Sequence, residues 1–168
     1  MHVRGAAIAL AVVVVVCATG PVLGAQEQEQ TLPPQLLEGG KVHLVNDLQA
    51  WADSMLVFRQ FRRDFRRIDR FEEEDDREQA DLVCILSGDP GVAGQHGIVN
   101  RGIPYPSGLS SSKIMLLVIF DAKTNNLLYF DAVNWDTQAN ATQRASHTRL
   151  VVRLNTALDE AGQDSRDS

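Results

Sequence analysis

The chain has 168 residues, of which 44% are apolar and 23% charged, and its formal net charge is −6. This length fits one domain with tails, and the composition is typical of a globular protein, not of a disordered one. A general nucleic-acid binder needs a basic surface, so the acidic balance argues against that class.

Residues 1–24 have the layout of a secretory signal peptide. Arg4 gives a basic start, and residues 6–18 are almost entirely apolar, a run too short to span a bilayer. Val22 and Gly24 fit the small-residue rule for the third and first positions before a cleavage site. We therefore expect cleavage after Gly24 or Ala25 and export to the periplasm or the extracellular space.

A lipid anchor at Cys17 is the alternative, and it is the one route by which we expect contact with a membrane. Val16 stands where bacterial lipoprotein signals usually carry Gly, Ala or Ser. Cleavage after the signal would leave Cys84 as the single cysteine, and the mature chain then forms no internal disulfide.

The sequence predicts a flexible leader over residues 25–40 and one folded domain over 41–161. A short strand over 41–45 alternates apolar and polar residues. A long amphipathic helix over 48–69 follows, with arginines on its solvated faces. Its apolar stripe recurs every three or four residues and comprises Trp51, Met55, Phe58, Phe61, Phe65 and Ile68.

Two further strands are expected before a long loop. Residues 71–74 are acidic enough to form a protected edge strand, and residues 80–86 form a mostly buried strand. The loop over 88–112 is rich in glycine and proline. A loop of this length in a compact domain is typical of either function or disorder.

Two apolar runs, residues 114–120 and 127–133, surround a polar segment that contains Asn125-Asn126. Asparagine adopts the left-handed backbone conformation of a tight reversal at low cost. The pattern predicts a β-hairpin at the centre of the sheet.

The chain is expected to end in a second amphipathic helix, capped by Ser146 and stopped by Gly162, and in a disordered tail over 162–168. The fold class is α+β in two layers, a mixed sheet of about five strands with two amphipathic helices on one face. Each helix has one apolar stripe to bury, which favours this arrangement.

No catalytic residue, metal site or cofactor is predicted. Cys84, with His43 or His96 as base, could act as a nucleophile, but its place in an apolar strand favours a core role. The histidines, including His147, have no metal-ligand spacing.

The loop holds two weak motifs. Residues 88–97 are glycine-spaced after a strand, but they lack the Lys-Ser/Thr ending of a phosphate loop and no helix pattern follows. The Ser-x-x-Lys spacing over 110–113 opens a strand, which points the two side chains to opposite faces. The polar residues that remain as binding candidates are Asp89, His96, Arg101 and Tyr105.

Three stretches carry a resemblance: KVHLVND at 41–47, EQADLVCIL at 78–86 and LLVIFDAKTNNLLYFDAV at 116–133. Together they resemble small exported bacterial domains of uncharacterised function. The layout is similar to envelope-assembly domains such as the N-terminal domain of TolB and curli-secretion lipoproteins. The resemblance implies a fold and an envelope setting, and it carries over no catalytic residue.

These observations favour a non-enzymatic exported module that binds a protein of the bacterial cell envelope through a sheet edge or the 88–112 loop. The motivating pattern is a complete core with no converging acid, base, nucleophile or ligand cluster. The alternative is a hydrolase-type enzyme whose site is formed by the 88–112 loop.

Overall fold

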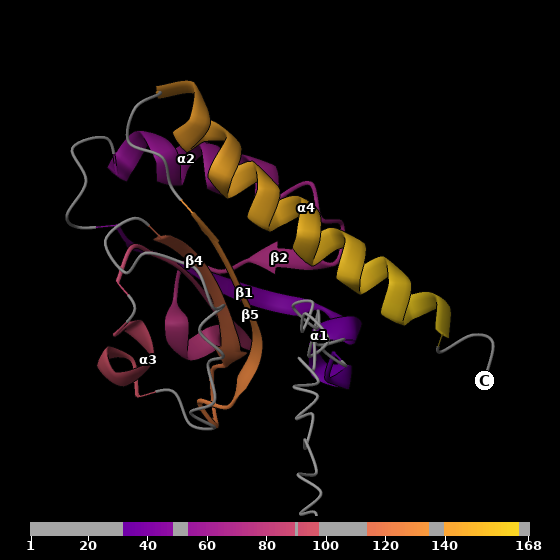
Figure 1. Cartoon of the computed structure of the whole chain (residues 1–168). Helices are drawn as coiled ribbons and strands as arrows, with labels where there is room; N and C mark the ends of the chain where they lie inside the picture. Colours follow the sequence, from indigo (N-terminus) through magenta and orange to yellow (C-terminus); the bar gives the residue numbers. More distant parts are fainter. Residues whose placement is uncertain (1–31, 49–53, 90, 98–113, 135–139, 165–168) are drawn as a thin grey trace, which may run out of the picture. The chain divides into compact units, whose positions relative to one another are not determined.

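A computed structural model describes residues 32–48, 54–89, 91–97, 114–134 and 140–164 (Figure 1). No helix within these ranges is both long and apolar enough to cross a membrane. The elements in chain order are α1 (Pro34–Glu38), β1 (Gly40–Asp47), α2 (Ser54–Phe65), β2 (Phe71–Glu73), the 3-10 turn η1 (Arg77–Gln79), β3 (Leu82–Ser87), α3 (Val92–Gln95), β4 (Ile114–Asp121), β5 (Leu127–Asn134) and α4 (Asn140–Asp164).

The strands form one five-stranded mixed sheet in the order β2-β1-β3-β4-β5, which confirms the predicted fold class. β1 runs parallel to both β2 and β3, whereas β3, β4 and β5 are antiparallel to one another in turn. The predicted hairpin is present as β4 and β5, but only β4 is central. β5 is an edge strand, so the expectation of a fully central hairpin is wrong.

β3 and β4 are buried on both faces of the sheet, which explains their unbroken apolar runs. Towards α2 and α4 they direct one set of side chains: Leu82, Cys84, Leu86, Met115, Leu117 and Ile119. Towards the opposite face, where Val92 of α3 packs, they direct another: Val83, Ile85, Ile114, Leu116, Val118 and Phe120.

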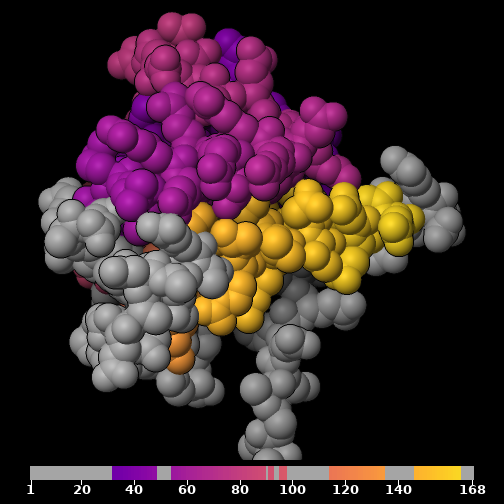
Figure 2. All heavy atoms as spheres, turned by 90° about the horizontal axis from the view of Figure 1, so that it is seen from above, coloured from indigo at the N-terminus to yellow at the C-terminus, as the bar shows by residue number. Residues whose placement is uncertain are grey.

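α2 and α4 lie side by side over the first face, as the view onto them shows (Figure 2). Phe61 and Phe65 of α2 are buried, as predicted. Met55 is 58% exposed, however, so its place in the apolar stripe is wrong. Val57 takes the buried position, since it lies four residues before Phe61 on the same helix face.

α2 is shorter than the predicted helix over 48–69. Within the described residues it begins at Ser54 and ends at Phe65, and residues 66–70 form turns. Trp51 lies outside the described residues. The arginines of this region are also not purely solvated, because Arg62 and Arg66 form ion pairs with Glu73 of β2.

The predicted flexible leader differs from the structure in its second half. Pro34 opens α1 at a position where proline costs no hydrogen bond, and Leu32 and Leu36 are buried in the core. α1 contacts α4. Two buried leucines thus provide the apolar contacts that order the chain before β1.

The C-terminal helix is longer than predicted at both ends. α4 covers Asn140–Asp164, so Ser146 is an interior, buried residue and not a cap. Gly162 lies inside the helix, so its assignment as a stop is wrong. A four-residue helix, α3, lies within residues 88–97, where the sequence predicts a loop, and the residues directly after this stretch lie outside the described ones.

The hairpin turn follows its predicted chemistry. Asn125 has φ +55°, the left-handed conformation that the sequence predicts there. The Asp121 carboxylate accepts hydrogen bonds from the backbone N–H groups of Lys123 and Thr124, which fixes the reversal.

Gly39 provides a test of the α1–β1 connection. Its φ is +75°, and a Cβ at this position would collide with the carbonyl oxygen of Arg70. Gly39→Ala is expected to lower the free energy of unfolding by about 2–4 kcal/mol, measured by urea denaturation. Gly97, at φ +65° with open space around it, is the matched control. Gly97→Ala should cost only about 1 kcal/mol, and equal losses at both sites would contradict the steric account.

Candidate functional site

Of the four predicted binding residues, the structure describes Asp89 and His96. Asp89 accepts hydrogen bonds from the N–H of Gly91 and from the side chain of Gln95, so its carboxylate caps the turn into α3. His96 follows α3 and is partly exposed. Arg101 and Tyr105 lie outside the described residues. Ligand binding by these four residues stays a prediction.

A second polar cluster lies at the carboxyl ends of the parallel strands β1 and β3. The Ser87 hydroxyl donates to Asp47 Oδ2 at 2.6 Å and accepts the N–H of Asp89 at 2.9 Å. Strand ends of this kind are common ligand sites in α/β proteins. No group of metal-binding side chains occurs among the described residues, however, and the contacts here hold the β3–α3 turn together.

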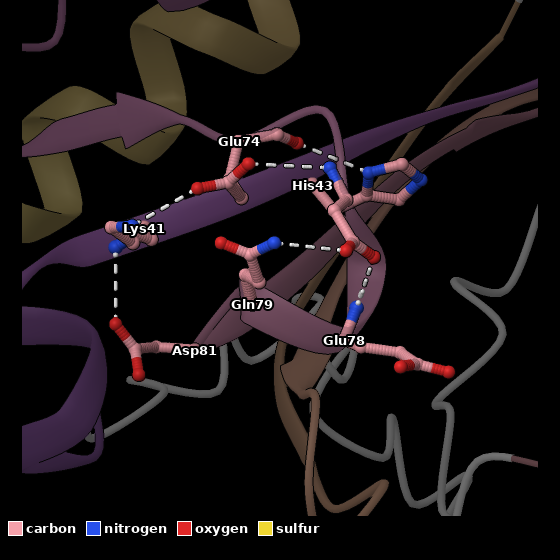
Figure 3. A network of polar contacts seen from close by, with 7 residues as sticks. Lys41, His43, Glu74, Glu78, Gln79 and Asp81 are labelled. Atoms are coloured by element: carbon pink, nitrogen blue, oxygen red, sulfur yellow. Dashed lines mark hydrogen bonds and ion pairs between the residues drawn. The ribbon is translucent and has the colours of Figure 1, made fainter.

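A third cluster lies where β2 ends, and it joins the residues after β2 to β1 (Figure 3). Lys41 Nζ donates to Glu74 Oε2 at 3.0 Å, and His43 Nδ1 donates to the Glu74 carbonyl oxygen at 3.1 Å. Asp81 accepts the N–H of Lys41, and Asp76 caps η1. The hydrogen bond with Lys41 lowers the pKa of Glu74, which favours the charged pair. β2 is short and acidic, and the residue after it is hydrogen-bonded to β1.

A buried polar contact joins α2 to α4. His147 Nε2 lies 3.3 Å from Asp64 Oδ2, and the Thr148 hydroxyl donates to the same oxygen at 3.1 Å. Arg63 and Arg67 lie near the other carboxylate oxygen. Asp64 and His147 are both buried between packed helices, so we assign the pair a structural role.

Burial raises the pKa of Cys84, which keeps its thiol protonated and supports its predicted core role.

The outer edge of β5 differs from the β2 edge because it is eight residues long. The N–H of Asp121 donates to the Asn126 carbonyl across the hairpin, so the odd-numbered residues of β4 face β5. Leu117 and Asp131 are therefore a hydrogen-bonded pair. By alternation, the β5 residues whose backbone groups face away from β4 are Phe130, Ala132 and Asn134.

Asp131 is the one acidic side chain within β5. It lies opposite the fully buried Leu117 and on the helix-covered face of the sheet. Its Oδ1 accepts a hydrogen bond from Arg153 of α4 at 3.2 Å and from the N–H of Ala132 at 2.7 Å. Burial raises the pKa of this carboxyl, although Ala132 and Arg153 act in the opposite direction.

A strand edge of this length, with side chains packed on both faces of the sheet, is a common docking surface for an extended peptide. Sequence reasoning missed it, because neither the edge position of β5 nor the contact between Asp131 and Arg153 is local in the sequence. The signal available was a lone Asp in an apolar strand. A buried charge whose burial outweighs its ion pair lowers stability, and such groups concentrate at functional sites.

The pH dependence of stability tests the cost of this charge. The pKa of Asp131 is higher in the folded than in the unfolded chain, so its contribution to stability is present at low pH and lost as pH rises through the folded pKa. Between about pH 3 and pH 7, wild type should therefore lose stability relative to Asp131→Asn, by about 1.4 kcal/mol per pKa unit of difference. Urea unfolding of both proteins across this range measures it. A gap that is constant, or that moves in favour of wild type, would contradict the assignment.

Comparison with known proteins gives structural likeness alone. No protein-family model and no curated protein matches the chain. The backbone is similar to that of a DUF4136 family protein from Bacteroides thetaiotaomicron VPI-5482, at 8% identity and a TM-score of 0.46, over 80% of this chain and 92% of that one. It is also similar to that of a PelC dodecamer from Paraburkholderia phytofirmans, at 12% identity and a TM-score of 0.40, over 74% of this chain and 91% of that one. Values this low assign neither a family nor a function.

Proposed function

We propose that this chain is an exported, non-enzymatic module of the bacterial cell envelope, and that it binds an extended segment of a partner protein along the outer edge of β5. The observation that carries the proposal is the contrast between the two sheet edges. β2 has three residues and is tied down by charged pairs, whereas β5 has eight residues and turns the backbone of Phe130, Ala132 and Asn134 outward.

The side chains of β5 favour strand addition on both faces. Tyr129 and Val133 belong to the core under α2 and α4, and Phe130 and Ala132 belong to the cluster on the opposite face. An added strand would extend both apolar layers by one row, so its alternate side chains would gain apolar contacts on each face. Backbone hydrogen bonds supply affinity in this mode, and the flanking side chains supply specificity.

The predicted signal peptide supports the envelope setting, and the resemblance to TolB-like and curli-secretion domains adds no support from the comparisons. Both remain predictions. The hydrolase alternative has less support, since the Asp89 carboxylate is engaged in capping α3.

The binding mode is tested by a proline in the outward register. A photo-crosslinker at Asn134, which is exposed at the end of β5, should capture the partner in bacterial cells. Ala132→Pro should reduce this adduct at least about tenfold, because proline removes the outward N–H and its ring blocks a neighbouring strand.

Ala132→Val is the matched control, since it keeps the N–H and a strong strand former at the same position. It should retain the adduct. An adduct of equal yield in Ala132→Pro, with the thermal unfolding temperature unchanged, would exclude strand addition at β5.

Export is tested separately by mass spectrometry of the mature protein. We expect an N-terminus directly after Gly24 or Ala25. A mature protein that begins with an acylated Cys17 would contradict this cleavage site and show that the protein is lipid-anchored.

A further inference from the structure

We propose that Asp131 acts as a gate on the β5 edge: its carboxylate occupies the outward N–H of Ala132, Arg153 holds the carboxylate in place, and an incoming strand must displace it. The proposal rests on the proposed function for the origin of that strand, which we take to be an extended segment of the partner protein.

The geometry of the contact supports the gate. The N–H of Ala132 faces away from β4, so the ladder within the sheet does not use it. Asp131 Oδ1 accepts this N–H at 2.7 Å. One of the outward donors that a new strand needs is therefore already engaged within the chain.

The second carboxylate oxygen of Asp131, Oδ2, indicates how the gate can open. Asp131 Oδ2 is buried and has no hydrogen-bond partner among the residues that the structure describes. Arg153 lies on the same carboxylate, with its side chain 56% exposed. When a strand takes the Ala132 N–H, the guanidinium can take both carboxylate oxygens, which is the favoured geometry of an Arg–carboxylate pair. The charge is then not left unpaired.

The choice of side chain also fits a gate. Asp131 lies in the same row of side chains as the buried Tyr129 and Val133, and its side chain is 18% exposed. An inward-pointing charge on an edge strand is a known means of preventing unwanted strand pairing. Among the described residues the titratable groups that face it are Arg153 from α4 and Tyr129 from β5.

Amide hydrogen exchange, followed residue by residue by NMR, tests the contact without any partner. In wild type the Ala132 amide should be protected although none of the described strands pairs with it. In Asp131→Ala it should exchange at least about tenfold faster, whereas Asp131→Asn keeps an acceptor oxygen and should exchange more slowly than Asp131→Ala. The amide of Leu117, which faces β5, is the internal reference for an intact hairpin. Unchanged Ala132 exchange in Asp131→Ala, with Leu117 still protected, would overturn the gate.

The crosslinker at Asn134 then tests the consequence. Asp131→Ala should raise the adduct yield with the partner, and Glu160→Ala, an exposed acid on α4, should not. If Ala132 exchanges faster in Asp131→Ala but the yield of the crosslinked adduct does not rise, the gate is wrong. The Ala132→Pro experiment then still decides the proposed function. If sedimentation shows that Asp131→Ala pairs with itself, the gate stands and its strand comes from a second copy, which contradicts the partner that we name.

Discussion

Backbone hydrogen bonding at the edges of the sheet is the constraint on which this structure depends. β3 and β4 are buried on both faces, so their N–H and C=O groups must be paired within the sheet. Each of these two strands has a neighbouring strand on both sides, which meets that requirement. The backbone groups without a partner strand in this sheet therefore lie on the outer edges of β2 and β5. In our proposal, the difference between these two edges decides where another strand can be added.

The two edges are treated differently in physical terms. β2 is short, and Glu73 is held by Arg62 and Arg66 of the α2 region. β5 is as long as its neighbour β4, and among the described residues the Asp131 carboxylate engages the outward N–H of Ala132. A short charged edge strand resists pairing in any state, whereas an incoming strand can displace a single hydrogen bond between a carboxylate and a backbone amide. This asymmetry is why we place recognition at β5 and not at β2.

Local patterns were enough to predict much of the fold. Asn125 marked the hairpin turn, and the spacing of Phe61 and Phe65 marked the buried face of α2. Met55 was misplaced, because three- and four-residue spacings admit two stripes and tertiary packing selected the one through Val57. α1 was missed because its order depends on burial of Leu32 and Leu36 in the core, a contact that no local pattern shows.

The candidate site could not be predicted from the sequence, for a related reason. Asp131 and Arg153 are 22 residues apart, and their contact requires α4 to pack on the sheet beside β5. The outward register of Ala132 follows only from knowing which residues of β4 face β5. Periodicity identifies a strand and its two faces, but it does not identify which strand is the edge or which amides the ladder leaves outside.

The most direct measurement of the central claim is the structure of the complex, solved by NMR with the protein and the captured partner segment labelled separately. The account predicts close backbone contacts between that segment and the outward-facing positions at Phe130 and Asn134, in the alternating pattern of a sixth strand. A segment bound elsewhere, for example on the exposed face of α4, with β5 free of contacts, would contradict it.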